Sequence, residues 1–180
     1  MASPASGVLA VLVGTDPAGP ARYCGAMPSF YRDPAAPAPN VPRRIGAAAV
    51  IERDGLFLLD RRRDDESWGF VGGAVDEDET VLEALRREVL EETGLQIGTA
   101  ALLGVFSDPS RIIAYPDGNI CRVLSVVFRV RPLDGQAVAS DESLELRWVT
   151  LEDLADLEFF RVQLPIRDAV LAGATEVVVA

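Results

Sequence analysis

Three glutamates near the middle of the chain, Glu88, Glu91 and Glu92, have the spacing expected of a shared chemical site. Residues 80–93 carry the periodic apolar pattern of a helix, and a rotation of about 100° per residue places Glu88 and Glu92 one turn apart. Glu91 lies beside them, and apolar side chains fill the adjoining stripe of the predicted helix. The three carboxylates are therefore expected to border the buried face of the helix.

This acidic cluster is unfavourable for an isolated helix. Like charges one turn apart cost roughly 0.2–0.5 kcal/mol per pair, and acids in the last turn oppose the helix dipole by about 0.3–1 kcal/mol each. A divalent cation would reverse the sign of these terms, because magnesium and manganese prefer hard oxygen ligands such as carboxylates. The alternative is a solvated helix face on which Arg86 and Arg87 form salt bridges with the acids.

The composition narrows the chemistry that these acids could perform. All 17 basic residues are arginine, and histidine and lysine are both absent. The sequence therefore excludes a histidine base, an imidazole metal ligand, a Schiff-base lysine and a phosphate-loop lysine. The 28 acidic residues outnumber the 17 arginines and give a formal net charge of −11. A negatively charged protein repels polyanions, which argues against nucleic-acid and membrane partners. A phosphorylated ligand would need local arginines or a bound divalent cation.

A longer pattern around the glutamates resembles the signature of the Nudix hydrolase family. That signature is Gly, five residues, Glu, seven residues, Arg-Glu, an aliphatic residue, any residue, Glu-Glu, any residue, Gly and an aliphatic residue. The chain matches every specified position, with Gly73, Glu79, Arg87, Glu88, Val89, Glu91, Glu92, Gly94 and Leu95. The resemblance covers about residues 45–172. It implies the α/β Nudix fold, an α/β/α sandwich with a mixed β-sheet.

The resemblance also implies roles for the matching residues. The residues expected to hold Mg²⁺ or Mn²⁺ are Glu88, Glu91, Glu92 and Gly73. The residues expected to support the site are Glu79, Arg87 and Gly94. Family members often add an acid from a later loop, and our candidate is Glu142, with Asp141 and Glu145 behind it. The alternative for Glu142 is an exposed turn residue with no catalytic role.

The implied reaction is hydrolysis of the pyrophosphate bond of a nucleoside diphosphate linked to another moiety. Metals would neutralise charge on the phosphoryl group and lower the pKa of an attacking water. The base that accepts the proton would be Glu88, Glu91 or Glu142. The substrate expected first is ADP-ribose or another nucleotide sugar, and the alternative is a nucleoside triphosphate or a dinucleoside polyphosphate.

Four further residues are candidates for binding that substrate. Arg62 could hold a phosphate, and Trp68, Phe70 and Tyr115 could stack on a base. The alternative for Arg62 is pairing with the acids at residues 64–66. The alternative for the three aromatic rings is packing in the core.

The elements that must position these residues follow from turns and periodicity. Asp54-Gly55 predicts a hairpin between strands at residues 45–52 and 56–60. The remaining predicted strands lie at residues 100–106, 122–130 and 144–149. The predicted helices lie at residues 80–93, 151–157 and 162–172. Val71 stands where the family commonly has proline, and valine should preserve the extended backbone there.

The first 42 residues differ in texture from the rest. Eight of the twelve prolines fall between Pro4 and Pro42, which predicts an extension with one strand at residues 8–13 and a Nudix domain at residues 43–180. Two cysteines are too few for a disulfide framework or a four-ligand zinc site, and no signal peptide or membrane span is visible. These features favour a cytoplasmic protein, and a homodimer is the commonest assembly if the chain oligomerises.

Two other classes of function remain open. One is a non-catalytic nucleotide-sensing module on the same fold, although such a module would be free to lose some of the three glutamates. The other is a structural or partner-binding protein whose working part is the extension at residues 1–42.

Overall fold

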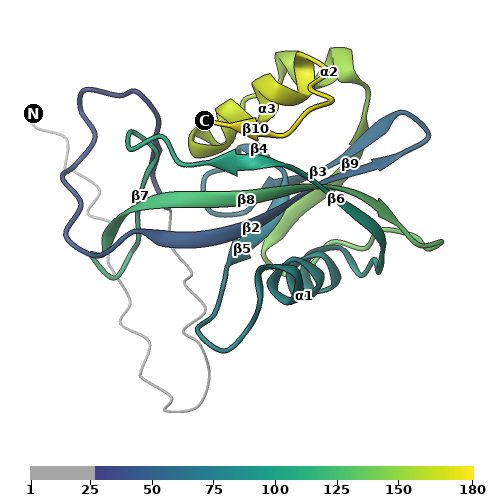
Figure 1. Ribbon diagram of the computed structural model, residues 1–180, viewed down its shortest axis with the longest axis horizontal. Coiled ribbons are helices and arrows are strands. Elements are labelled where there is room, and N and C mark those ends of the chain that lie inside the picture. Colours follow the sequence, from purple (N-terminus) through teal and green to yellow (C-terminus); the bar gives the residue numbers. More distant parts are fainter. Residues whose placement is uncertain (1–26) are drawn as a thin grey trace, which may run out of the picture.

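The structure is a computed structural model that describes residues 27–180 of the 180-residue chain. A mixed β-sheet forms the middle layer (Figure 1). Helix α1 (Val81–Thr93) covers one side of the sheet, and helices α2 (Leu151–Asp156) and α3 (Leu164–Leu171) cover the other. These three layers confirm the predicted α/β/α sandwich. The strand predicted at residues 8–13 lies outside the described residues.

Two long strands form the centre of the sheet. Strands β2 (Arg44–Arg53) and β8 (Ile120–Pro132) run parallel to each other. The chain turns from β2 into the antiparallel strand β3 (Leu56–Arg62) through Asp54 and Gly55, whose φ angles are 53° and 77°. Positive φ at both central residues is typical of a two-residue hairpin turn. The predicted hairpin is therefore confirmed.

Five more strands extend this centre. Strand β6 (Ile97–Phe106) pairs antiparallel with β8, and β9 (Ser143–Val149) pairs antiparallel with β3. The short strands β7 (Ile112–Ala114), β1 (Ser29–Phe30) and β10 (Val178–Val179) pair with β8, β7 and β6 respectively. The sequence predicted β6, β8 and β9. It missed the short strands, because two or three residues are too few to show an alternating pattern.

The sheet opens where the hairpin ends. Strand β3 separates from β2, and two short strands that the sequence also missed, β4 (Trp68–Gly69) and β5 (Val71–Ala74), pair with β3 and β2 respectively. Gly72 has a φ of 150°, and a Cβ atom there would lie 2.2 Å from the carbonyl oxygen of Ala47. Only glycine therefore allows β5 to approach β2 so closely. Val71 is buried in an extended strand, as expected.

Helix α1 confirms the helix predicted at residues 80–93. It begins with a capping box in which the Glu83 N–H donates to Thr80 Oγ1 over 3.2 Å and the Thr80 N–H donates to Glu83 Oε2 over 2.8 Å. It ends at Gly94, whose φ is 67°. The fully buried apolar side chains that attach it to the sheet are Ala84, Leu85 and Val89.

The opposite side of the sheet is covered by the C-terminal helices. The helices predicted at residues 151–157 and 162–172 are present, but the second is divided into a 3₁₀ turn, η1 (Arg161–Gln163), and α3. The buried amide of Gln163 bonds to both backbone groups of Phe70: its Nε2 donates to the Phe70 oxygen over 3.0 Å, and its Oε1 accepts from the Phe70 N–H over 2.7 Å. This double contact joins the start of α3 to the strand opening.

Part of the predicted N-terminal extension also contacts the sheet. Strand β1 lies at the edge of β7, and the Asn40 N–H donates to the carbonyl oxygen of Ile120 over 2.9 Å. The Ile120 N–H donates in turn to Asn40 Oδ1 over 2.7 Å. Residues 29–41 are therefore joined to the sheet at the start of β8.

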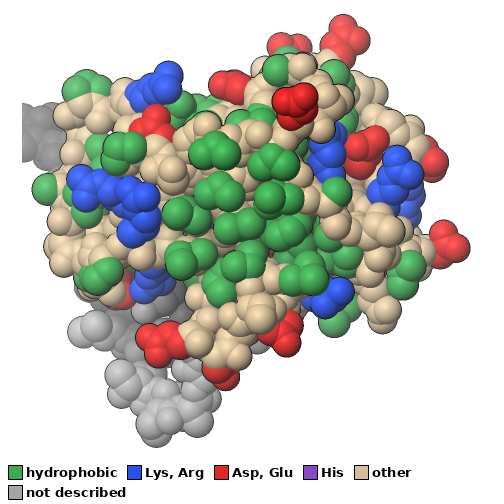
Figure 2. All heavy atoms as spheres, viewed as in Figure 1, with side chains coloured by type: hydrophobic (Ala, Val, Ile, Leu, Met, Phe, Trp, Pro, Cys, Tyr) green, Lys and Arg blue, Asp and Glu red, His purple; other side chains and the backbone are tan. Residues whose placement is uncertain are grey.

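The surface combines charged rims with an apolar area. Figure 2 shows hydrophobic side chains gathered at the centre of the face on which β8 and β6 lie in front. The exposed large hydrophobic residues include Leu102 of β6, Ile45 of β2 and Val179 of β10. Within residues 27–180, no helix has the length and apolar character needed to cross a membrane.

Candidate active site

The three glutamates of α1 lie in different environments. The side chain of Glu88 is 13% exposed and Glu92 is also half-buried, whereas the side chain of Glu91 is 61% exposed. Glu88 and Glu92 lie against β5, at the place where β3 and β2 separate. The structure therefore brings two of the three predicted metal ligands together at the strand opening and leaves Glu91 at its outer edge.

Glu92 lies over the backbone of β5. The Gly72 N–H donates to Glu92 Oε2 over 3.2 Å. Burial raises the pKa of Glu92 well above its usual range, and the neighbouring acids Glu88 and Asp60 raise it further. The Gly72 N–H and Arg62 lower this pKa, but by less than burial and the neighbouring acids raise it. The surrounding residues therefore do not balance a negative charge on Glu92.

Glu88 lies directly against the glycine loop. A Cβ atom on Gly73 would lie 2.3 Å from Glu88 Oε1, so any side chain at residue 73 would displace the carboxylate. Burial raises the pKa of Glu88, while Arg87 lowers it through a hydrogen bond from Nη1 to Oε1 over 2.7 Å. Gly73 thus leaves room for this carboxylate, and its role as part of the metal site stays a prediction.

Arg87 and Glu79 connect the loop to the helix. Arg87 donates to Glu79 through Nη2 over 2.6 Å and through Nε over 3.1 Å, and it also donates to the Ala74 carbonyl oxygen over 3.1 Å. This paired contact lowers the pKa of Glu79 and raises that of Arg87. The same guanidinium reaches Glu91 Oε2 over 3.4 Å. The geometry is that of the predicted brace.

Two acids from other elements complete the cluster. Glu142 lies in the exposed loop before β9, which runs beside β3, and its charge raises the pKa values of both Glu88 and Asp60. Asp60 near the end of β3 is buried, and burial is the main cause of its own raised pKa. The sequence analysis did not single out Asp60. The signal available there was an acid at the end of the apolar strand sequence Leu-Phe-Leu-Leu-Asp.

The arginines of the loop after β3 are paired with nearby groups. Arg62 donates to Asp64 from Nε over 3.0 Å and from Nη2 over 2.7 Å, and its guanidinium carbon lies 4.1 Å from the centre of the Phe160 ring. Arg61 pairs with Glu66 over 2.9 Å, and Arg63 donates to two backbone carbonyl oxygens, one in the loop before β9 and one at the first residue of β9. These contacts match the alternative of local pairing, although Arg62 remains close enough to influence Glu92 and Asp60.

The aromatic candidates are not arranged as one binding surface. Trp68 and Phe70 are 7% and 3% exposed, and both belong to the core beneath the C-terminal helices. Tyr115 is half-buried at the other end of the sheet, where the Arg44 guanidinium lies 4.6 Å from its ring centre. These positions favour packing for Trp68 and Phe70, and they separate Tyr115 from both rings.

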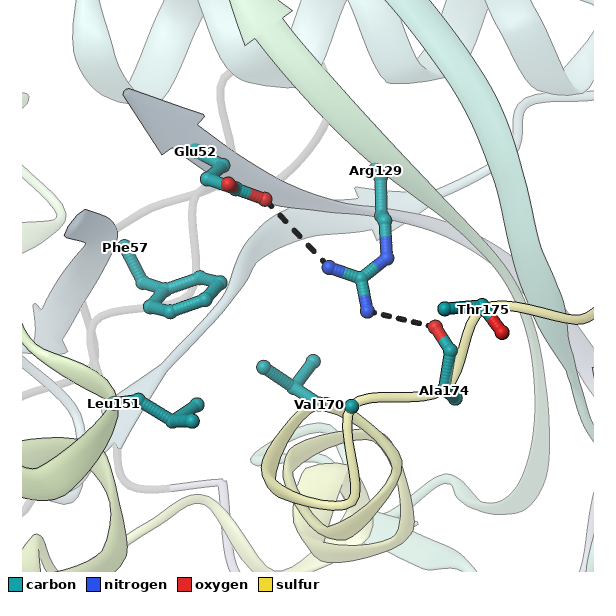
Figure 3. Close-up of a pocket in the computed structure, with 8 residues that line it drawn as sticks. Glu52, Phe57, Arg129, Leu151, Val170, Ala174 and Thr175 are labelled. Atoms are coloured by element: carbon teal, nitrogen blue, oxygen red, sulfur yellow. Dashed lines mark hydrogen bonds and ion pairs between the residues drawn. The ribbon is translucent and has the colours of Figure 1, made fainter. Parts of the chain in front are cut away.

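A cavity of about 450 Å³ lies elsewhere, between the sheet and the C-terminal helices (Figure 3). Arg129 points into it and holds Glu52 over 3.6 Å and the carbonyl oxygen of Ala174 over 2.9 Å. Phe57 and Val170 form apolar walls. None of the lining residues comes from α1, so the acidic cluster lies outside this cavity.

The donors at the strand opening fit a hard divalent cation. Among residues 27–180, no three acidic or cysteine side chains lie close enough to hold one ion together. However, Mg²⁺ commonly uses only one or two carboxylates, with waters and substrate phosphates as its other ligands. Glu92 supplies oxygen donors whose charge is not balanced. Glu88 shares the Arg87 guanidinium with Glu79 and Glu91, and Gly73 keeps the backbone beside it. The pair therefore has donor chemistry that suits a hard divalent cation.

Comparisons with known proteins cover the same part of the chain. A family model described as NUDIX domain matches residues 42–168. A relative from Methanocaldococcus jannaschii named ADP-ribose pyrophosphatase is 36% identical over 118 residues, which cover 64% of this chain and 66% of the relative. A relative from Enterobacter named nucleoside triphosphatase NudI is 30% identical over 124 residues, which cover 64% of this chain and 88% of the relative.

A solved structure shows the same fold. The solution structure of the Escherichia coli ORF135 protein has 28% sequence identity and a TM-score of 0.58, and the match covers 73% of this chain and 90% of that protein. The chain spans just under two thirds of the length of the first curated relatives that it matches, 65% and 66%.

Proposed function

The chain belongs to the Nudix hydrolase family, and from that membership we propose that it hydrolyses the pyrophosphate bond of a nucleoside diphosphate linked to another moiety. The observation that carries the proposal is the pair of half-buried acids, Glu88 and Glu92, held against Gly72 and Gly73. Glu88 shares one arginine with two other acids, and the charge of Glu92 is not balanced by its neighbours. A protein that used this fold only for binding would not need to maintain such an unfavourable cluster.

The proposed metal is Mg²⁺ or Mn²⁺, held by Glu88, Glu91, Glu92 and the Gly73 backbone. When bound, it would neutralise the diphosphate and activate the attacking water. The residues of the chain then have separate tasks. The Gly72 N–H orients Glu92, while Arg87 and Glu79 hold the loop against the helix. Arg87 also restrains Glu88 until the cation competes for its carboxylate.

The proposed base is Glu88, Glu91 or Glu142. Glu91 and Glu142 are exposed, which suits a group that must exchange its proton with solvent. Glu88 is half-buried and carries a raised pKa, which suits a group that must accept a proton. Separate glutamine variants at the three positions distinguish these roles when metal binding and turnover are both measured. Loss of the base lowers kcat even at saturating metal, whereas loss of a ligand mainly weakens metal binding.

ADP-ribose or another nucleotide sugar is the proposed substrate. The relative named ADP-ribose pyrophosphatase supports this choice, and the relative named nucleoside triphosphatase supports a nucleoside triphosphate as the second candidate. Among the proposed substrate contacts, Arg62 is the one that lies beside the acids. Trp68, Phe70 and Tyr115 would need to present a ring face that the packing described above largely covers.

Further parts of the proposal concern the whole protein. We propose that residues 43–180 form the catalytic domain and that residues 1–42 precede it as an extension. We also propose that the protein acts in the cytoplasm on a small nucleotide, without a nucleic-acid or membrane partner, and that it forms a homodimer. Analytical ultracentrifugation of the full chain tests the last point, since a sedimentation coefficient of a monomer would contradict it.

The central experiment measures product formation by the purified full chain with Mg²⁺ or Mn²⁺. The substrates are ADP-ribose, other nucleotide sugars, NADH, dinucleoside polyphosphates and nucleoside triphosphates. We expect metal-dependent turnover with a preference for ADP-ribose or another nucleotide sugar. Glu92→Gln should lower turnover by orders of magnitude without changing the fold, whereas Glu176→Gln, at an exposed residue near the C-terminus, should leave it unchanged. Unaltered turnover in Glu92→Gln would sink the proposed mechanism.

A further inference from the structure

Asp60 is a buried acid with an unsatisfied oxygen. It lies near the end of β3, opposite Gly69 of β4, and it is 8% exposed. It follows Leu58 by two residues, so its side chain points to the α1 side of the sheet, where Leu58 packs. Within residues 27–180, Asp60 Oδ1 has no hydrogen-bond partner. Buried polar atoms are normally hydrogen-bonded, so a buried carboxylate oxygen without a partner needs a physical explanation.

The arginines near Asp60 are engaged with other acids. Arg62 is the nearest cation by its effect on Asp60, but it bonds to Asp64 through two nitrogens and also lies 3.8 Å from Asp65. Arg87 is engaged by Glu79, Glu88 and Glu91. Asp60 therefore faces the strand opening without an arginine of its own.

The surroundings of Asp60 add negative charge. Glu92 of α1 and Glu142 of the loop before β9 are acids that lie near Asp60. Glu142 raises the pKa of Asp60, and Asp60 raises the pKa of Glu92. In the described part of the chain, the Ser143 Oγ atom, on the strand that pairs with β3, also lacks a hydrogen bond of ordinary geometry, but it lies close enough to Asp60 to lower the pKa of that carboxyl. A buried carboxylate oxygen without a hydrogen bond, at the end of β3 and beside an acid of α1, is a suitable ligand for a bound cation.

We propose that Asp60 is a metal-binding residue of this site, which shares a divalent cation with Glu92 across the opening between β3 and α1. This inference rests on the proposed function, because it assumes that Glu92 belongs to the metal site. Asp60 lies outside the Nudix signature at residues 73–95, and it comes from strand β3 instead of helix α1.

A bound cation would explain why β3 carries an acid, Asp60, on its buried face. A cation that bridges Asp60 and Glu92 would balance two carboxylates that have no arginine between them. It would also tie the helix to the diverging end of β3, so that the opening has a fixed width when substrate phosphates arrive. Mg²⁺ and Mn²⁺ suit this arrangement, because two carboxylates leave most of the coordination positions to water and phosphate.

The test measures Mn²⁺ binding by the full chain without substrate, from the free Mn²⁺ signal in electron paramagnetic resonance. Asp60→Asn keeps the shape of the side chain and removes its charge. We expect a Kd about 10-fold weaker than that of the wild type, or the loss of one bound ion. Asp134→Asn removes the same charge from an exposed turn, and its Mn²⁺ binding should equal that of the wild type.

Thermal unfolding separates this role from a purely structural one. If Asp60 is a metal ligand, Asp60→Asn in EDTA should unfold at a temperature no lower than the wild type, and added Mn²⁺ should raise that temperature less than in the wild type. Should Asp60→Asn fail to fold, Asp60→Ser provides the same measurements with a smaller uncharged side chain. A Mn²⁺ Kd and stoichiometry equal to those of the wild type in the folded variant would overturn the inference.

The outcome also separates this inference from the proposed function. Unchanged Mn²⁺ binding in Asp60→Asn, together with lost turnover in Glu92→Gln, would reject the role of Asp60 and retain the hydrolase. Weakened Mn²⁺ binding in Asp60→Asn, with no metal-dependent turnover of any substrate by the wild type, would retain the metal site and reject the hydrolase.

Discussion

Arg111 and Asp60 are both charged side chains buried at the sheet, but their surroundings are opposite. Arg111, just before β7, is 0% exposed and donates from all three nitrogen atoms: to Val162 O over 2.7 Å, to Ser125 Oγ over 2.8 Å and to Phe106 O. Burial lowers its pKa to about 10, which still leaves it charged at neutral pH. Asp60 has no such partners for its Oδ1 atom.

This difference separates a structural charge from a functional one. The bonds of Arg111 join the β6–β7 connection, β8 and the 3₁₀ turn η1, so the charge stabilises the fold. Near Asp60 the acids outnumber the cations that are available to them, so the cation proposed above would balance a charge that the arginines of the chain do not. Buried polar groups are normally satisfied within a protein, and exceptions tend to mark functional sites.

The largest effect on stability is expected from removing the satisfied charge. Arg111→Met leaves two carbonyl oxygens and a hydroxyl without donors, and we expect a loss of about 3 kcal/mol or more in the free energy of unfolding. Urea denaturation measures this loss. Arg131→Met, at an exposed position on β8, should change stability by no more than about 0.5 kcal/mol. A loss below about 1 kcal/mol in Arg111→Met would break the comparison.

A neutral buried contact provides an intermediate effect. Gln163→Leu removes the amide that satisfies the N–H and the C=O of Phe70, and we expect a loss of about 2 kcal/mol. The control is Gln136→Leu, at an exposed loop residue. Equal midpoints of urea denaturation for the two variants would show that the Phe70 contact contributes little to the fold.

The smallest effect on stability should have the opposite sign. The pKa of Glu92 is raised in the folded protein, so its contribution to stability is fully present below the pKa of the unfolded chain and is lost as pH rises through the folded pKa. In EDTA, Glu92→Gln should therefore unfold at a higher temperature than the wild type near neutral pH and at the same temperature near pH 4. Identical profiles of unfolding temperature against pH would contradict the unbalanced charge.

Local signals predicted much of the framework. The Asp54-Gly55 hairpin and the caps Thr80 and Gly94 involve residues close in sequence, so the pattern that favours them is visible in the chain itself. The short strands β4 and β5 were missed because each is stabilised by pairing with a distant strand and is too short for a periodic signal. The aromatic rings of Trp68 and Phe70 gave no sign of being buried, since aromatic residues suit both a core and a binding surface.

The sequence by itself determined the family, the fold class and the acids on α1, because a fixed spacing on a helix places side chains without further information. The tertiary structure decided which of these acids converge. It exposes Glu91, buries Glu88 and Glu92, and adds Asp60 from β3 by separating that strand from β2. Burial and long-range strand pairing are properties of the folded chain, and they alone determine where a carboxylate is left without a partner.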